Sequence, residues 1–132
     1  MDLPENVLAL LRAPSICYLA TTMPDGSPQV TQVWVDSDGT DVVINTVEGH
    51  QKLRNVRRDP RVALTLSDPA RPSDYVQIRG EVHEITTDGA REHIDEVSQK
   101  YLGKPYPSFG GAATQQRVML RITPRKVSSP RG

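Results

Sequence analysis

The sequence lacks several features that would point to particular classes of protein. Its single cysteine, Cys17, cannot form an internal disulfide, and its neighbours Ile16 and Tyr18 indicate a buried thiol on a strand. The 16 basic residues balance 16 acidic ones, and only 5% of residues are aromatic, which argues against a nucleic-acid-binding surface. With neither a signal peptide nor an apolar run of membrane-spanning length, we expect a cytoplasmic protein without nucleic-acid or membrane partners.

Catalytic and nucleotide-binding motifs are lacking as well. The three histidines, His50, His83 and His93, show no metal-ligand spacing, so no metal site is expected. No predicted strand is followed by G-x-G-x-x-G or G-x-x-x-x-G-K-[ST], and neither a Ser-His-Asp nor a Cys-His arrangement is supported. No catalytic residue can therefore be named, and a bound cofactor would have to supply the chemistry.

What is present is the pattern of one small, mainly β domain covering residues 1–132. Hairpin signals at Asp25-Gly26 and Asp38-Gly39, with little strand-helix alternation, predict an antiparallel barrel and not a parallel α/β fold. Helices are expected after Asp2, in the basic segment before Pro60, and between a Thr87-Asp88 cap and Gly103. Six strands are expected, at residues 16–21, 28–36, 42–46, 62–66, 75–85 and 118–123.

Three further expectations concern irregular segments. Gly80 interrupts the long fifth strand and predicts a bulge or sharp bend. Residues 104–113 are too rich in glycine and proline for a simple connection, and both a lid and a surface loop fit them. Residues 128–132 are expected to be a flexible tail.

The stretch 42–60 holds the clearest candidate binding site. A β-branched strand leads into a turn at Glu48-Gly49, and a short basic segment follows with Lys52 in its first turn. Unpaired N–H groups at a helix start favour an anion, and the glycine allows close approach, so a phosphate site is one interpretation. An amphipathic helix that packs Leu53 and Val56 inward explains the same spacing.

A family resemblance bears on this choice. The run from Lys52 to Ala63, KLRNVRRDPRVA, resembles the K-x-R-N-x-x-R-D-P-R-V-A signature of pyridoxamine-phosphate-oxidase-like, F420-dependent enzymes. These enzymes belong to the split β-barrel flavin and deazaflavin superfamily. Residues 19–22, 25–34, 75–82 and 121–127 match in the same order, so the resemblance runs from about Leu8 to Val127.

The resemblance implies an α+β, mainly β fold: a split β-barrel of about six antiparallel strands with flanking helices, of the FMN-binding, pyridoxamine-phosphate-oxidase-like type. It implies an oxidoreductase in which coenzyme F420 passes hydride to an unsaturated organic acceptor. It also implies a homodimer whose cofactor sites lie at the interface.

The family's cofactor-binding residues can be carried over onto the matching positions. The resemblance places Gln29, Val30, Thr31 and Gln32 along the ring system, with Asn45 and Thr46 at its border. The turn from Glu48 would hold the phosphate through Gly49, His50, Gln51 and Lys52. The remaining members of the set, expected to come from the partner subunit, are Ser73, Tyr75 and Val76.

Two other functions fit the same residues. FMN-using relatives usually carry an Arg-Lys pair after the turn, where this chain has His50-Gln51; this favours F420 and leaves FMN as the alternative. An FMN-dependent oxidase or reductase, including pyridoxamine-phosphate oxidase chemistry, is therefore one rival. The other is an F420-binding or carrier protein without turnover.

Strand patterning gives an independent argument for a dimer. Strands 28–36 and 42–46 carry large groups on both faces, whereas only one face can point into so small a barrel. A second subunit would cover the remainder. Trp34, the largest of these groups, is expected in the core or at the dimer interface.

Overall fold

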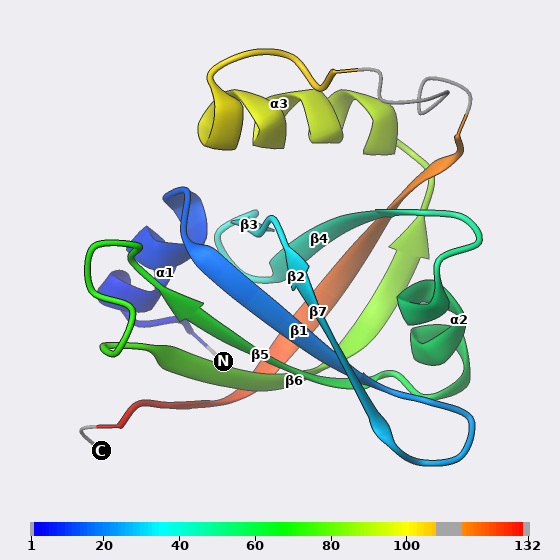
Figure 1. The fold of residues 1–132 in the computed structure, drawn as a ribbon, viewed down its shortest axis with the longest axis horizontal. Helices are drawn as coiled ribbons and strands as arrows, with labels where there is room; N and C mark the ends of the chain where they lie inside the picture. The colour runs from blue at the N-terminus through cyan, green and yellow to red at the C-terminus, as the bar shows by residue number, and fades with distance from the viewer. Residues whose placement is uncertain (1, 108–114, 131–132) are drawn as a thin grey trace.

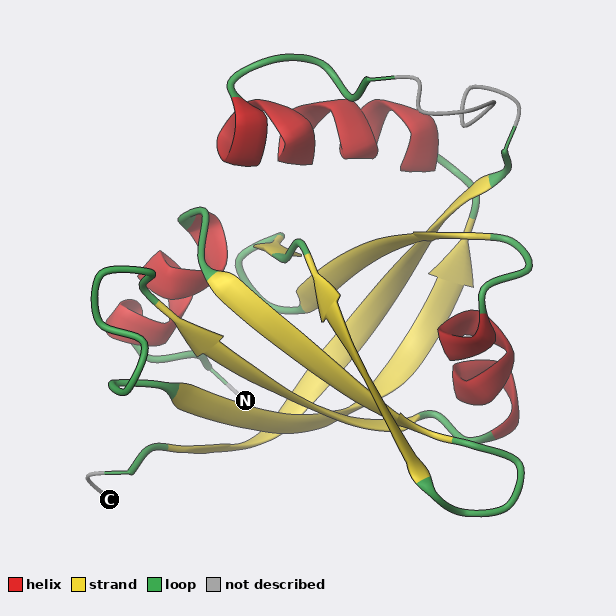
Figure 2. Ribbon diagram, viewed as in Figure 1, coloured by secondary structure: helices red, strands yellow, loops and turns green. Residues whose placement is uncertain are grey.

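The computed structural model describes residues 2–107 and 115–130, which form one curled antiparallel sheet with three helices (Figures 1 and 2). The helices are α1 (Glu5–Arg12), α2 (Gln51–Arg58) and α3 (Ala90–Leu102). The strands are β1 (Ile16–Thr22), β2 (Pro28–Val33), β3 (Asp36–Ser37), β4 (Val42–Val47), β5 (Arg61–Ser67), β6 (Val76–Thr86) and β7 (Arg117–Ser128).

The strand order across the sheet is β2-β1-β5-β6-β7-β4-β3, and every neighbouring pair is antiparallel. The two edge strands, β2 and β3, are joined by only Trp34 and Val35. Three residue steps reach at most ~11 Å, whereas the edges of a flat sheet of this size would lie ~29 Å apart. The sheet must therefore curl until its edges meet, which confirms the predicted split β-barrel.

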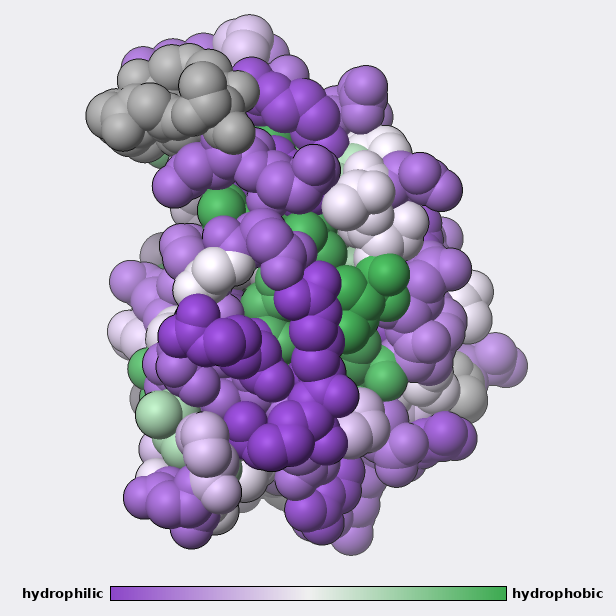
Figure 3. Space-filling view, turned by 90° about the vertical axis from the view of Figure 1, so that its right-hand side faces the viewer, coloured by the Kyte–Doolittle hydropathy of each residue, from purple (hydrophilic) through white to green (hydrophobic). Residues whose placement is uncertain are grey.

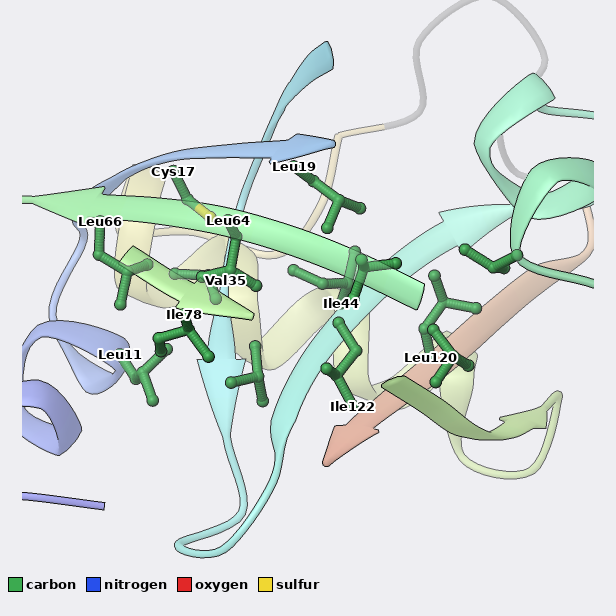
Figure 4. Packing of buried hydrophobic residues seen from close by; sticks show 14 of the residues in the cluster. Leu11, Cys17, Leu19, Val35, Ile44, Leu64, Leu66, Ile78, Leu120 and Ile122 are labelled. Carbon is green, nitrogen blue, oxygen red and sulfur yellow. The ribbon is translucent and has the colours of Figure 1, made fainter. Parts of the chain in front are cut away.

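The barrel interior is filled by aliphatic side chains that alternate along the strands (Figure 4). Leu19, Ile44, Leu64, Ile78 and Leu120 are all at most 2% exposed. The helices α1 and α2 lie at opposite ends of the barrel (Figure 1), and each contributes two aliphatic residues to the same core: Val7 and Leu11 from α1, Leu53 and Val56 from α2. Cys17 is also in this core, as the sequence predicted.

The helix α3 lies against the outside of β4 and β7. Ala90 of α3 forms a small apolar cluster with Val43 and Met119. The second apolar face of β4 is thus covered within the chain, and it supplies no argument for a second subunit.

Gly80 lies where β6 shifts its register against β7. A Cβ atom at this position would lie 2.3 Å from the Thr123 carbonyl oxygen, so only glycine permits the close approach of the two strands. The irregularity predicted at Gly80 is confirmed.

Several element boundaries differ from the sequence-based expectations. The expected strand 28–36 is divided into β2 and β3, and the expected last strand continues to Ser128, whose hydroxyl is 3.3 Å from Gln77 Nε2. Helix α1 begins after Pro4 and α3 after Gly89, so Asp2 and Thr87-Asp88 are not the helix caps. Of the loop expected at 104–113 and the tail at 128–132, residues 108–113 and 131–132 lie outside the described residues.

Candidate functional site

A cavity of about 620 Å³ lies along the seam where the two edges of the sheet approach each other. It is bounded by the start of β1, the β2–β3 link, the end of β4, the turn into α2, and α3. The residues that line it are Pro14, Ser15, Ile16, Cys17, Gln32, Val33, Trp34, Asn45, Thr46, Val47, His50, Lys52, Ile94, Tyr101, Leu102, Tyr106 and Arg117.

The charged groups of this lining are all basic. Lys52 and Arg117 line the cavity with His50, and no carboxylate occurs among the lining residues that the structure describes. Burial, reinforced by repulsion from Arg117, holds the pKa of Lys52 below its ordinary value. Burial and the positive charges of Lys52, Arg117 and Arg54 likewise lower the pKa of His50. An anion bound in the cavity would stabilise the charged forms of Lys52 and His50 and so raise both pKa values.

Backbone donors lie beside these cations. The turn before α2 places Gly49 at a φ of +98°, and His50 is the N-cap of the helix without a side-chain hydrogen bond that caps it. Within the described part of the chain, no acceptor contacts the N–H groups of Gln51 and Lys52. These donors and the helix dipole both favour an anion at this end of the cavity.

Aromatic side chains form another wall of the cavity. Trp34 stacks on Tyr101 with ring centroids 5.1 Å apart and an interplanar angle of 9°, and Tyr106 meets Trp34 edge-on at 6.1 Å. Burial raises the pKa of Tyr101 to about 12, so its hydroxyl stays protonated and donates to the Ser15 carbonyl at 2.7 Å. Trp34 is thus half-buried in the cavity wall and lies outside the hydrophobic core, which was one of its two expected places; the other, a dimer interface, stays a prediction.

A chain of hydrogen bonds leads from the cavity to the outside of the barrel. Arg117 Nε donates to Asn45 Oδ1 at 2.9 Å, and Asn45 Nδ2 donates to the Ala90 carbonyl at 2.8 Å. Asn45 Nδ2 also lies 3.1 Å from His93 Nδ1, and His93 Nε2 lies 3.0 Å from Asp36 Oδ2. Although burial acts to raise it, the pKa of Asp36 is lowered by hydrogen bonds from His93 and the Ser37 N–H and by the charge of Lys100.

Comparison with known proteins assigns the chain to a family. Residues 3–129 match the pyridoxamine 5'-phosphate oxidase family. The chain belongs to that family. The resemblance seen in the sequence is thereby confirmed, and the protein is similar to flavin and deazaflavin oxidoreductases.

Among solved structures, one described as an F420 reductase shares 31% sequence identity with this family member, with a TM-score of 0.82 over 96% of this chain and 98% of the other. The conserved hypothetical protein Rv2991 of Mycobacterium tuberculosis shares 28% identity, with a TM-score of 0.71 over 96% of this chain and 84% of its own. General Stress Protein 26 of Bacillus anthracis str. Sterne, at 16% identity and a TM-score of 0.70 over 98% and 94%, shows the shared fold alone.

The structure brings part of the predicted cofactor set of this pyridoxamine 5'-phosphate oxidase family member together. Gln32, Asn45, Thr46, His50 and Lys52 all line the cavity. Gly49 and Gln51 lie in the adjoining turn and first helical turn. Glu48 instead pairs with Arg57 at 2.5 Å, and both side chains are close to half exposed.

The other predicted residues of β2 divide between the two faces of the strand. Gln29 accepts hydrogen bonds from Asn55 at 3.2 Å and from Thr21 at 3.3 Å, below α2. The Thr31 hydroxyl is buried and has no partner among the residues that the structure describes. Val30 is 62% exposed on the outer face. Of the four residues predicted on this strand, only Gln32 lines the cavity, and Gln29, Val30 and Thr31 do not.

The residues predicted to serve a partner's site lie away from the cavity of their own chain. Ser73 and Tyr75 are exposed, Tyr75 by 41%, whereas the Val76 side chain is 6% exposed within the core of its own barrel. The predicted contribution across a dimer therefore depends on Ser73, Tyr75 and the main chain of Val76.

Sequence reasoning missed Arg117, the Tyr101–Tyr106 wall and His93. The His93 side chain is only 11% exposed. Arg117 is the first residue of β7, and its partner Asn45 lies 72 residues earlier, so no local pattern connects them. A basic residue at the cavity end of a predicted strand was the one signal present.

No group of three or more His, Cys, Asp or Glu side chains arranged to hold a metal occurs in residues 2–107 and 115–130, and none of their helices could span a membrane.

The helix that carries Lys52 is fixed to the barrel by a buried amide. Asn55, fully buried, donates from Nδ2 to Thr21 Oγ1 at 3.0 Å and to Gln29 Oε1 at 3.2 Å, while its Oδ1 accepts from Gln51 Nε2 at 2.8 Å. This places the N-terminal turn of α2 relative to β1 and β2. The asparagine in the signature KLRNVRRDPRVA is thus a structural support for the lysine.

We expect Asn55→Ala to lower the free energy of unfolding by about 2–3 kcal/mol, because it leaves buried polar groups unpaired and opens a small void. Chemical denaturation would measure this change. Arg57→Ala is the matched control on the same helix; it breaks only an exposed ion pair and should cost much less. Equal losses in the two variants would contradict the role assigned to Asn55.

Proposed function

We propose that the protein is an F420-dependent oxidoreductase that passes hydride from the reduced deazaflavin to an unsaturated organic acceptor. The observation that carries this proposal is the cavity beside α2, where Lys52, Arg117 and free backbone N–H groups meet without a carboxylate among the described residues. Similarity to an F420 reductase at 31% identity over nearly the whole of both chains supports the choice of cofactor.

The described residues fit such a cofactor in its charge and in its shape. A basic, glycine-containing turn suits a phosphate, and Gly49 is open on the side where a Cβ would stand, since nothing lies within 4 Å of that position. The aromatic wall of Trp34 and Tyr101 suits a flat ring system. When bound, the deazaflavin would supply the hydride chemistry that the side chains of this protein lack.

The protein's own residues would bind and orient. Lys52 and the N–H groups of Gln51 and Lys52 would hold the phosphate, and His50 would lie beside it. Ile94 and Leu102 of α3 line the same cavity and would exclude water from part of it.

We expect tighter binding of F420 than of FMN, because His50-Gln51 replaces the Arg-Lys pair usual in FMN-using relatives. A side-by-side calorimetric titration measures both dissociation constants, followed by an assay of reduced F420 oxidation with a panel of unsaturated acceptors. FMN binding as tight or tighter would reverse the choice of cofactor. F420 binding without turnover on any acceptor would favour a carrier protein.

We also expect Lys52→Ala to weaken F420 binding about ten- to hundred-fold while the protein stays folded. A charge-assisted contact to phosphate is worth about 1.5–3 kcal/mol. Arg57→Ala removes a cation from the opposite, exposed side of α2 and should leave the dissociation constant unchanged. An unaltered dissociation constant in Lys52→Ala would show that Lys52 does not contact the phosphate.

The homodimer is part of this proposal, with its interface on the outer face of β2, β1 and β5. Strand register places Val30, Ala20 and Ala63 in one row across these strands, and Gln32, Tyr18 and Thr65 in the next. Val30 is 62% and Tyr18 46% exposed, and the small alanines between them allow close approach of a second copy. Figure 3 shows a neighbouring side of the molecule, the one that carries α2, where apolar surface lies between hydrophilic residues.

Tyr18→Glu should therefore shift the protein toward monomers, because two symmetry-related charges would be brought into one apolar interface. Light scattering over a dilution series measures the shift. Gln99→Glu is the matched control, since it adds the same charge on the exposed side of α3. A wild-type protein that is monomeric at every concentration would contradict the dimer.

A further inference from the structure

Arg117 is a buried cation without a carboxylate partner. Its residue is 7% exposed, and no acidic side chain pairs with it in residues 2–107 and 115–130. Its interactions are the bond from Nε to Asn45, a hydrogen bond with Tyr106, and a contact with the Tyr106 ring at 5.1 Å. Burial lowers the pKa of Arg117, because the charged guanidinium group is removed from water and no carboxylate of the described residues compensates it. A buried charge of this kind is costly unless it is paired.

Asn45 determines how the guanidinium group is presented. Because Nε donates to Asn45, the plane of the fork is fixed at one end; Arg117 lines the cavity, and in residues 2–107 and 115–130 its Nη groups have no hydrogen-bond partner other than Tyr106. The carbonyl oxygen of Ala90 accepts only, and Arg117 donates only, so the amide of Asn45 has a single orientation that satisfies both.

The orientation of Asn45 in turn determines the state of His93. The Asn45 amide group donates to His93 Nδ1, so this nitrogen accepts, and the ring proton is on Nε2, where it donates to Asp36. Lys100, 3.9 Å from the other oxygen of Asp36, completes the chain on α3. Four side chains from β7, β4, α3 and β3 therefore form one directed series of hydrogen bonds, in which the donors run from Arg117 through Asn45 and His93 to the acceptor Asp36.

From this geometry we infer that Arg117 is a second anion-binding residue of the cavity, acting with Lys52 on a phosphate or carboxylate group, and that Asn45 and His93 are its positioning residues. The inference rests on the proposed function only in placing the anionic group of a cofactor in this cavity. It adds that this group is bound from two sides, by a lysine on α2 and by a pre-oriented arginine fork on β7.

The direct test uses inorganic sulfate, a tetrahedral dianion whose charge does not change near neutral pH. The chain has a single tryptophan, Trp34, which lines the cavity and touches Tyr106, so its fluorescence reports occupancy. Sulfate is titrated at constant ionic strength, with sodium chloride as the balancing salt. We expect saturable binding to the wild type and a loss of about ten- to hundred-fold in Arg117→Gln.

Two companion variants separate binding from folding. Arg117→Lys keeps the buried charge but lacks the fork and the Nε bond, and it should show an intermediate loss. Arg125→Gln removes an equal charge from the exposed end of the same strand and should bind sulfate as the wild type does. Absence of any saturable sulfate response in the folded wild type, or equal affinity of wild type and Arg117→Lys, would overturn the inference.

The positioning role is tested at His93. His93→Asn places an amide oxygen near the position of Nδ1 and keeps an acceptor for Asn45, whereas His93→Leu removes it. Sulfate affinity should fall about five- to tenfold in the leucine variant, in line with a lost orienting hydrogen bond, and recover in the asparagine variant. Equal affinities in the two variants would assign His93 a packing role only.

The outcome for F420 is read separately from the outcome for sulfate. A wild type that binds sulfate through Arg117 but does not bind F420 would refute the proposed cofactor and leave the anion site intact. If the wild type and Arg117→Gln bind F420 equally well, the inference is refuted and the proposed function stays intact.

Discussion

The link of two residues between β2 and β3 is the constraint on which the structure depends. It ties the two edges of a seven-stranded sheet together, so the sheet can only exist curled. Its polar backbone groups are bonded by α3: the Val35 N–H donates to the Tyr101 hydroxyl at 3.2 Å, and Lys100 donates to the Val35 carbonyl. The Val35 side chain is fully buried in the core. The seam is therefore held from inside by packing and from outside by two side chains of one helix.

This seam also explains where the cavity lies. A sheet whose edges approach without a continuous hydrogen-bonded ladder leaves a gap in the wall, and the gap is bordered by strand ends from both edges. Side chains distant in sequence, such as Gln32 of β2 and Asn45 of β4, thus come to one place. Lys52 reaches it because Asn55 fastens α2 to β1 and β2. The basic cluster is a consequence of barrel closure as well as of composition.

The fold class could be predicted because hairpin turns at Asp25-Gly26 and Asp38-Gly39 separate β-rich segments with little strand-helix alternation. The two-residue strand β3 could not, since two residues have no period, and so the position of Trp34 at the seam was lost with it. The basic turn from Gly49 to Lys52 was recognised from local sequence. Arg117 was missed because its role depends on Asn45, Ala90 and His93, which meet only in three dimensions.

The pairing of β4 with β7 has a consequence for how the chain folds. Its nearest partners, Val47 and Arg117, are 70 residues apart, against 6 for the Thr22–Pro28 hairpin of β1 and β2. In a flexible chain this difference adds ~2 kcal/mol to the entropic cost of closing the loop. The hairpins can therefore form early, whereas the ladder that brings Asn45 beside Arg117 belongs to the slow, non-local part of folding. During folding, the local hairpins would therefore form first, and the anion site around Arg117 would form last, when β4 pairs with β7.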